Sequence, residues 1–159
     1  MRYAQIRDLD VSNGEGVRVS LFVQGCDFHC NDCFNSSTWD WEGGEQFTRN
    51  DLKLLLRLCN KTYIQGLSIL GGEPLHPKNL SMVTCIARAF KELCPNKDLW
   101  IWSGYTFESY ISKLDILDCA DVIVDGQFIS DQQNYKLHFR GSENQRIWRK
   151  IENNWVVTE

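Results

Sequence analysis

Alternating apolar and polar positions divide this chain into strands and helices. Runs rich in β-branched and aromatic residues predict four strands, at 17–23, 67–70, 99–102 and 121–126. Between them, apolar residues three and four positions apart predict two helices, one at 48–59 and one that begins near Leu80 and ends at Pro95. Strands that alternate with helices are typical of an α/β protein with a mostly parallel sheet.

Local signals refine the ends of these elements. Thr48 is the expected N-cap of the first helix, with Asp51 in its first turn. A short helix is expected near 107–114, and the tail predicts two strands around a turn at Asn153-Asn154. Four to six strands in all are too few to close a barrel, so we expect an incomplete (β/α) barrel that is open on one side.

Composition narrows the class of protein. A chain of 159 residues predicts a single domain spanning 1–159. Its net charge of −4 argues against a nucleic-acid-binding protein, which normally carries a basic face. The charged N-terminus lacks the apolar core of a signal peptide, and no apolar run approaches the roughly 20 residues that cross a bilayer. We therefore expect a cytoplasmic protein with no nucleic-acid and no membrane partner.

Residues that could take part in binding or catalysis follow each of the four predicted strands. They are Cys26, Gly71-Gly72-Glu73, Ser103-Gly104 and Asp125-Gly126. Ligands of α/β proteins bind at the carboxyl ends of the strands. We therefore expect these four loops to converge on one site.

The loop after the first strand, GCDFHCNDCFN, carries three closely spaced cysteines, Cys26, Cys30 and Cys33. Thiolates select zinc, copper(I) or iron–sulfur clusters. A structural zinc ion needs a fourth ligand, and His29 is a candidate, although its position next to Cys30 makes a shared metal difficult. Three thiolates on a [4Fe–4S] cluster would leave one iron open to a substrate, an interpretation that we favour while zinc remains the alternative.

Four further cysteines are scattered along the chain: Cys59, Cys85, Cys94 and Cys119. Thiols stay reduced in the cytoplasm, so these residues do not indicate a disulfide framework. We expect them to be small buried apolar residues.

The spacing Cys26-x-x-x-Cys30-x-x-Cys33 resembles the signature of the radical S-adenosylmethionine enzymes. Five ordered blocks narrow the resemblance: NGEGVRVSLFVQGCDFHCNDCFNSSTW, LSILGGEPLHPKNL, LWIWSGYTFE, DVIVDGQF and FRGSENQR. Together they resemble the activating enzymes of anaerobic, class III ribonucleoside-triphosphate reductases. The resemblance implies one radical S-adenosylmethionine domain in which the three cysteines hold a [4Fe–4S] cluster and S-adenosylmethionine chelates the fourth iron.

The resemblance also implies roles for residues around the cluster. The Gly71-Gly72-Glu73 motif would bind the methionyl amino group, and Ser103 would lie along the cofactor. The superfamily usually has an aromatic residue before the third cysteine, whereas here Asp32 precedes Cys33 and Phe34 follows it.

Contacts to adenine are therefore expected around Asp32, Cys33 and Phe34, and a ribose contact at Asp125. Arg140 is a candidate for the cofactor carboxylate or for the partner protein, with a surface arginine as the alternative. His29 and His76 are expected to be structural or surface residues.

The implied reaction has a protein as its substrate. Reduction of the cluster, by a donor such as flavodoxin, would cleave S-adenosylmethionine to a 5′-deoxyadenosyl radical, which abstracts hydrogen from a C-terminal glycine of the anaerobic reductase and leaves a glycyl radical. Two other classes of protein remain open: a small zinc or iron–sulfur electron carrier, and a radical enzyme with another target, such as a formate-lyase activator or a nucleoside-modifying enzyme.

Overall fold

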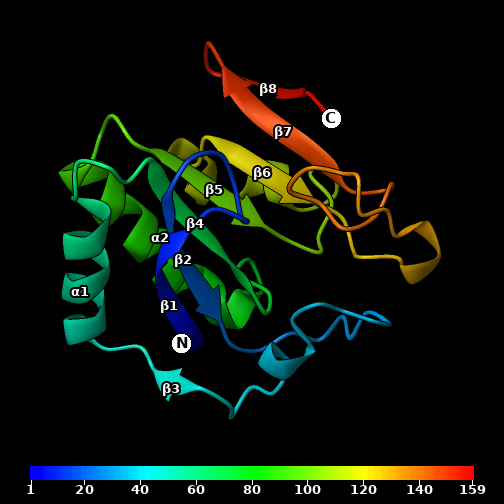
Figure 1. Cartoon of the computed structure of the whole chain (residues 1–159), viewed down its shortest axis with the longest axis horizontal. Helices are drawn as coiled ribbons and strands as arrows, with labels where there is room; N and C mark the ends of the chain where they lie inside the picture. The colour runs from blue at the N-terminus through cyan, green and yellow to red at the C-terminus, as the bar shows by residue number, and fades with distance from the viewer.

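One sheet of eight strands and two helices form the fold of this mixed α/β protein (Figure 1). The computed structural model describes residues 1–159. The strands are β1 (Arg2–Asp10), β2 (Arg18–Val23), β3 (Glu45–Gln46), β4 (Gly66–Gly71), β5 (Asp98–Trp102), β6 (Val122–Asp125), β7 (Arg146–Ile151) and β8 (Asn154–Val157). The helices are α1 (Arg49–Cys59) and α2 (Pro77–Leu93).

The sheet has a parallel centre and antiparallel flanks. Its strand order is β3-β1-β2-β4-β5-β6-β7-β8. Strands β2, β4, β5 and β6 pair in parallel, whereas β3, β1, β7 and β8 are joined to the sheet by antiparallel pairs. The prediction of a mostly parallel sheet thus holds at the centre and is wrong at both edges, where short connections suffice because antiparallel neighbours need no crossover. No pair joins β3 to β8, so the sheet is open.

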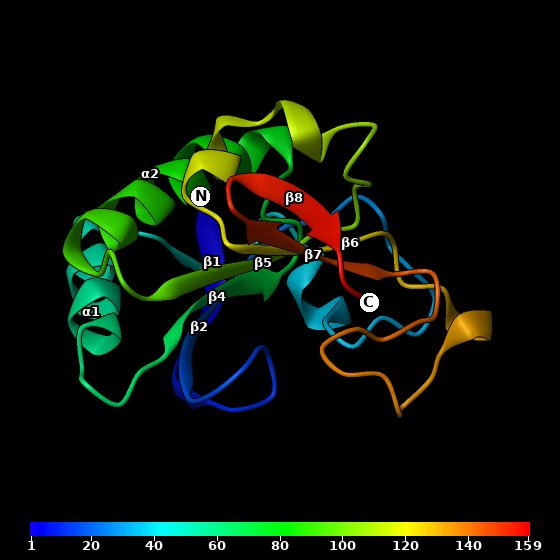
Figure 2. The ribbon, with the colours of Figure 1, turned by 90° about the horizontal axis from the view of Figure 1, so that it is seen from above.

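The two faces of the central strands have different neighbours. Leu21, Ile69 and Ile101 belong to the main hydrophobic core, which includes residues of α1 and α2. The residues that follow each of them point to the opposite face, because side chains alternate along a strand. Figures 1 and 2 show both helices on one side of the sheet, and the loops formed by residues 27–44 and 127–145 away from the helices.

Helix α1 begins as its sequence predicts. The backbone N–H of Asp51 donates to the Thr48 hydroxyl, and the Asp51 carboxylate accepts from the backbone N–H of Thr48. This capping box satisfies N–H groups that have no partner within the helix. Helix α2 is capped instead by the ring of His76, and it ends before Pro95.

The four predicted strands and two predicted helices are confirmed, whereas the short helix expected near 107–114 forms only in part, as a 3-10 turn. That turn is Ile111–Lys113, and a second 3-10 turn, Asp115–Asp118, follows after Leu114 in an extended conformation. The hydroxyls of Ser109 and Ser112 donate to nearby backbone carbonyls, which competes with regular helix formation.

The ends of the chain differ from the sequence interpretation in two ways. The tail hairpin is confirmed, but its turn lies one residue earlier than expected, at Glu152 and Asn153, which have φ values of 49° and 65°. Strand β1 was not predicted at all, because its register with β2 is irregular between Tyr3 and Gln5 and again between Arg7 and Asp10. Each irregularity interrupts the alternation by which a strand is recognised.

Neither helix has the length and apolar character needed to cross a membrane.

Candidate metal centre

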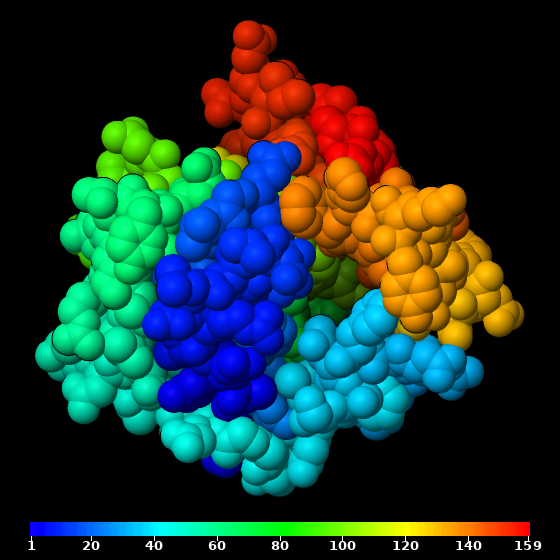
Figure 3. Space-filling model, in the orientation of Figure 1, coloured from blue at the N-terminus to red at the C-terminus, as the bar shows by residue number.

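A cavity of about 810 Å³ lies on the face of the sheet that the helices leave uncovered. Phe22, Leu70 and Trp102 form its floor, each next to a residue of the helix-side core. Figure 3 shows the hollow between the N-terminal strand, the segment around residue 35 and the loop around residue 135. Its wall includes Cys26, Cys30, Cys33, Glu73, Ser103 and Gly126, so each of the four predicted loops supplies at least one residue, although Asp125 itself does not line the cavity.

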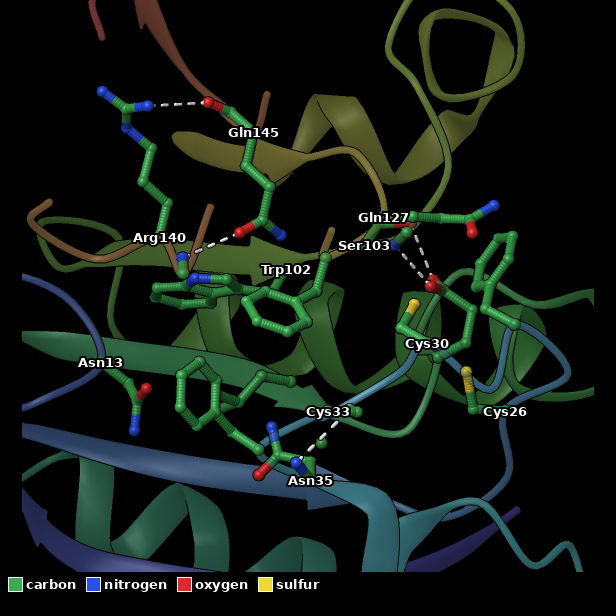
Figure 4. Close-up of a pocket in the computed structure, with 18 of the residues that line it drawn as sticks. Asn13, Cys26, Cys30, Cys33, Asn35, Trp102, Ser103, Gln127, Arg140 and Gln145 are labelled. Carbon is green, nitrogen blue, oxygen red and sulfur yellow. Dashed lines mark hydrogen bonds between the residues drawn. The ribbon is translucent and has the colours of Figure 1, made fainter. Parts of the chain in front are cut away.

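All three cysteines of the predicted metal loop line this cavity (Figure 4). Cys26 is buried, while Cys30 and Cys33 are partly exposed, and all three thiols are free. Burial raises the pKa of the Cys26 thiol to about 11 and also raises that of Cys30. The metal-free thiols of Cys26 and Cys30 therefore favour their protonated forms, and metal binding would have to displace those protons.

Glycines allow the loop to approach the end of β4. Gly25 has a φ of +98°, and a Cβ there would lie 2.0 Å from the ring of Trp41. A Cβ on Gly72 would lie 2.5 Å from the Gly25 carbonyl oxygen. Gly72 therefore allows a close approach that a side chain would prevent, and its neighbour there is the backbone of Gly25.

The donor set fits a cluster better than a single ion. Nowhere in the chain do three His, Cys, Asp or Glu side chains lie close enough together to hold one metal ion. The ring of His29 stacks on Trp39 at 4.5 Å between centroids and is exposed, so it does not complete a zinc site. A cubane cluster carries its thiolates on separate irons and therefore requires a wider spacing of sulfurs.

The other four cysteines lie elsewhere. Cys59, Cys94 and Cys119 are buried in the helix-side core, which confirms their predicted role as small apolar residues. Cys85 is exposed on α2, so the same prediction is wrong for that residue. None of the four lines the cavity, and the loop is left with three thiols.

Glu73 is buried at the cavity wall. One carboxylate oxygen accepts hydrogen bonds from the backbone N–H of Leu75 and the Ser103 hydroxyl, and the other accepts from the N–H of Gly104. These contacts join the loops after β4 and β5. Burial raises the pKa of Glu73 to about 7, against the opposing effect of the three hydrogen bonds. An ionised carboxylate can accept about four hydrogen bonds, so one position is left for a ligand.

The residues predicted beside adenine lie apart from each other. Phe34 is 63% exposed, packs against Phe128 at 5.3 Å between ring centroids and lines the cavity. Asp32 does not line it; its carboxylate accepts a hydrogen bond from the Ser130 hydroxyl on the exposed side. The backbone of Asp32 is left-handed, with a φ of 57°, directly before Cys33 and Phe34, which line the cavity.

Asp125 is a second predicted site residue, after Asp32, that the structure does not bring to the cavity. Its carboxylate is completely buried, forms an ion pair with Arg146 and accepts from the backbone N–H of Phe107. It borders a smaller hollow on the other side of Gly126 and Gln127. Through these contacts Asp125 joins β6 to β7 and to the loop after β5.

The long loop between β6 and β7 supplies residues that sequence reasoning missed. Gln127, Phe128, Tyr135 and Gln145 all line the cavity. Arg140 also lines it, but its guanidinium donates to the carbonyls of Glu143 and Gln145, within its own loop. Loops of this length without regular structure are often functional, and that signal was available in the sequence.

Comparison with known proteins identifies the family. A family model described as "4Fe-4S single cluster domain" matches residues 12–148. The anaerobic ribonucleoside-triphosphate reductase-activating protein of Enterobacteria phage T4 is 43% identical over 155 residues, which cover 98% of each chain. The chain belongs to this family of activating proteins.

Bacterial members of the activating-protein family are similar over nearly the same span. The protein of that name from Vibrio cholerae is 43% identical over 94% of this chain and 98% of its own. The one from Escherichia coli K12 is 38% identical over 92% of this chain and 97% of its own. The family resemblance drawn from the five sequence blocks is thereby confirmed, and the span matched by the cluster-domain model contains the whole cavity wall except Arg7.

Proposed function

We propose that this protein activates an anaerobic ribonucleoside-triphosphate reductase by generating a glycyl radical on it. The observation that carries the proposal is the set of three free thiols on one wall of a large cavity, in a chain of the activating-protein family. Cys26, Cys30 and Cys33 would hold a [4Fe–4S] cluster with one iron left for S-adenosylmethionine. When bound, such a cluster supplies the electron that splits S-adenosylmethionine to methionine and a 5′-deoxyadenosyl radical, which takes hydrogen from a C-terminal glycine of the reductase.

The residues of the chain would bind and orient this cofactor. The remaining acceptor position of Glu73 suits the α-ammonium group, and Ser103 fixes the carboxylate that would receive it. Phe34 and Trp102 offer apolar surface to the adenine side of the ligand. Asp125 and Asp32 fit a direct contact less well, because the structure gives each carboxylate another partner and neither lines the cavity.

The form of the sheet suits a macromolecular substrate. Four parallel strands, β2, β4, β5 and β6, are connected on one face by α1, α2 and two 3-10 turns. This arrangement supports our proposal that the fold is an incomplete (β/α) barrel. Its uncovered face would admit the glycine loop of the reductase. A one-electron donor such as flavodoxin would reduce the cluster, and the reducing cytoplasm is the compartment in which these thiols stay available.

Anaerobic reconstitution with iron and sulfide tests the proposal. The protein should turn brown, and addition of dithionite and S-adenosylmethionine should release 5′-deoxyadenosine. Mixed with an anaerobic reductase that is known to accept activation, it should produce a glycyl radical seen by electron paramagnetic resonance. A colourless zinc protein, or cofactor cleavage without any radical on a competent reductase, would overturn the assignment.

A further inference from the structure

The three residues between Cys26 and Cys30 each contact a different part of the protein. Phe28 packs against Tyr105, with 4.9 Å between ring centroids, and His29 stacks on Trp39. Asp27 makes the polar contacts of this segment. The segment has no regular secondary structure, so these side chains and a few backbone hydrogen bonds determine where its thiols lie.

Asp27 links the cysteine loop to two separate elements. One carboxylate oxygen accepts a hydrogen bond from the indole N–H of Trp41 at 2.7 Å. The other lies 3.0 Å from Nε2 of His76, the residue that caps α2. Trp41 in turn contacts the His76 ring at 4.6 Å between centroids and lies under the ammonium of Lys78.

The tautomer of His76 follows from its second contact. The backbone N–H of Lys78 donates to Nδ1 of His76 at 3.1 Å, so this nitrogen carries the lone pair. In the neutral ring the proton is then on Nε2, where it points at Asp27 and completes a donor–acceptor pair. Both ring nitrogens are thus used, one for the helix and one for the loop.

We propose that Asp27, His76 and Trp41 form a latch that positions the cysteine loop for binding its cluster. The latch joins the segment between the first two cysteines to the N-terminus of α2 and to the turn at Trp41 that follows the loop. It would hold the loop in place before any metal arrives. The idea rests on the proposed role of the three cysteines as cluster ligands, although its main test does not.

The backbone of the cysteine loop is strained at two positions, and the latch would oppose the relaxation of that strain. His29 and Asp32 have left-handed backbone conformations, with φ values of 48° and 57°. A non-glycine residue in that region is sterically disfavoured relative to its ordinary conformations. Unless other contacts hold it, such a segment relaxes, and the spacing of the three sulfurs changes with it.

Amide hydrogen exchange in the metal-free protein tests the latch directly. The N–H groups of Gly25, Cys26 and Cys33 are hydrogen-bonded within the protein and serve as reporters. Asp27→Ala should speed their exchange by about tenfold, while the amides of β4 and β5 keep their protection. Unchanged exchange at all three reporters would overturn the proposal.

Two further variants separate the latch from general stability. His76→Asn keeps a side-chain acceptor suited to an N-cap but is too short to reach Asp27, so it should speed the same reporters. Asp27→Asn keeps an acceptor for Trp41 only and should give an intermediate effect, which also provides a milder variant if Asp27→Ala folds poorly. Asp115→Ala removes another exposed carboxylate, one without a side-chain hydrogen bond, and should leave the reporters unchanged.

The reconstituted protein offers a second measurement. Asp27→Ala should lose iron to a chelator several-fold faster than the wild type and should shift the midpoint potential of the cluster, whereas Asp115→Ala should do neither. If wild-type protein binds no cluster at all, the proposed function fails, yet the exchange experiment still decides whether the latch exists. Equal iron loss in Asp27→Ala and wild type would show that the latch does not position the ligands.

Discussion

The two faces of the central sheet differ in their surroundings: one packs into a closed core and the other lines the cavity. On β4, Ile69 is completely buried among aliphatic side chains beneath the helices, while the next residue, Leu70, lines the cavity. On β5 the same step leads from Ile101 to Trp102. The helix side is a closed core of aliphatic residues, three phenylalanines and three cysteines. The other side keeps an open volume bordered by thiols, aromatic rings and a buried carboxylate.

The difference shows how one sheet can provide stability and chemistry at once. A close-packed core resists the loss of even one methylene group, so residues that must adapt to a ligand cannot lie within it. Placing the cavity on the opposite face leaves the strands rigid while the loops at their ends carry the reactive groups. Cysteine illustrates the division, since the same side chain acts as a small apolar residue on one face and as a candidate ligand on the other.

The largest expected effect comes from removing a thiol on the cavity side. Cys26→Ala should reduce iron to background and abolish 5′-deoxyadenosine formation, because Cys30 and Cys33 are already used as ligands and no fourth cysteine lines the cavity to replace Cys26. Iron analysis and product chromatography measure both. Cys119→Ala, on the helix side, should keep full iron and lose only about 1 kcal/mol of unfolding free energy. Full iron in Cys26→Ala would show that the division between the faces is wrong.

Adjacent residues of β4 test the packing of the two faces. Ile69→Ala should lower the unfolding free energy by about 2–5 kcal/mol, because it leaves a void in the closed core. Leu70→Ala should lower it by about half as much, since its neighbours on the cavity side already leave open space. Denaturant unfolding of the metal-free protein gives both values. An equal or larger loss at Leu70 would contradict the comparison.

Glu73 makes the cavity face sensitive to pH. Its pKa is raised from 4.5 to about 7 in the folded protein, so between these pH values the folded state keeps a proton that the unfolded chain releases. The unfolding free energy should therefore fall as pH rises across this window, by on the order of 3 kcal/mol from this group. Glu73→Gln should remove that part of the slope, as measured by unfolding at several pH values. A slope that is identical in the two proteins would rule out the shift.

The smallest effect is expected at the start of α1, far from the cavity. Thr48→Ala removes the hydroxyl that accepts from Asp51 and should cost about 1 kcal/mol of stability. Thr48→Ser keeps the hydroxyl and should restore most of it. Iron content should not change in either variant, and thermal unfolding with iron analysis provides the check. Loss of iron in Thr48→Ala would mean that the helix side and the site are coupled.

Much of the fold could be predicted because its signals are local. The central strands are runs of β-branched and aromatic residues, and the Thr48–Asp51 capping box is a pattern of four consecutive positions. The conformation of residues 107–114 could not be predicted from local signals. Asp125, from another strand, accepts a hydrogen bond from the backbone N–H of Phe107, and the Ser112 hydroxyl donates to the backbone. Strand β1 escaped because two register irregularities disrupt its alternation.

The sequence predicted the candidate metal ligands of the site but not the other residues that line the cavity. Three cysteines within eight residues are a strong local signal, and the glycines before Glu73 are another. The roles expected for Asp125 and Asp32 at the cofactor remain predictions, and the structure pairs these residues with Arg146 and Ser130 instead. Tyr135 and Gln127 reach the cavity only because the chain returns to it from β6, a placement that no local pattern reveals.

The sequence by itself determined the order of the central elements, the cap of α1 and the trio of thiols, since each depends on residues close together in the chain. Tertiary structure decided which face of the sheet stays uncovered, which carboxylates are buried in pairs, and how Asp27 meets His76 from 49 positions away. These features arise from contacts between distant segments, and their energies depend on burial and distance that only the folded chain establishes.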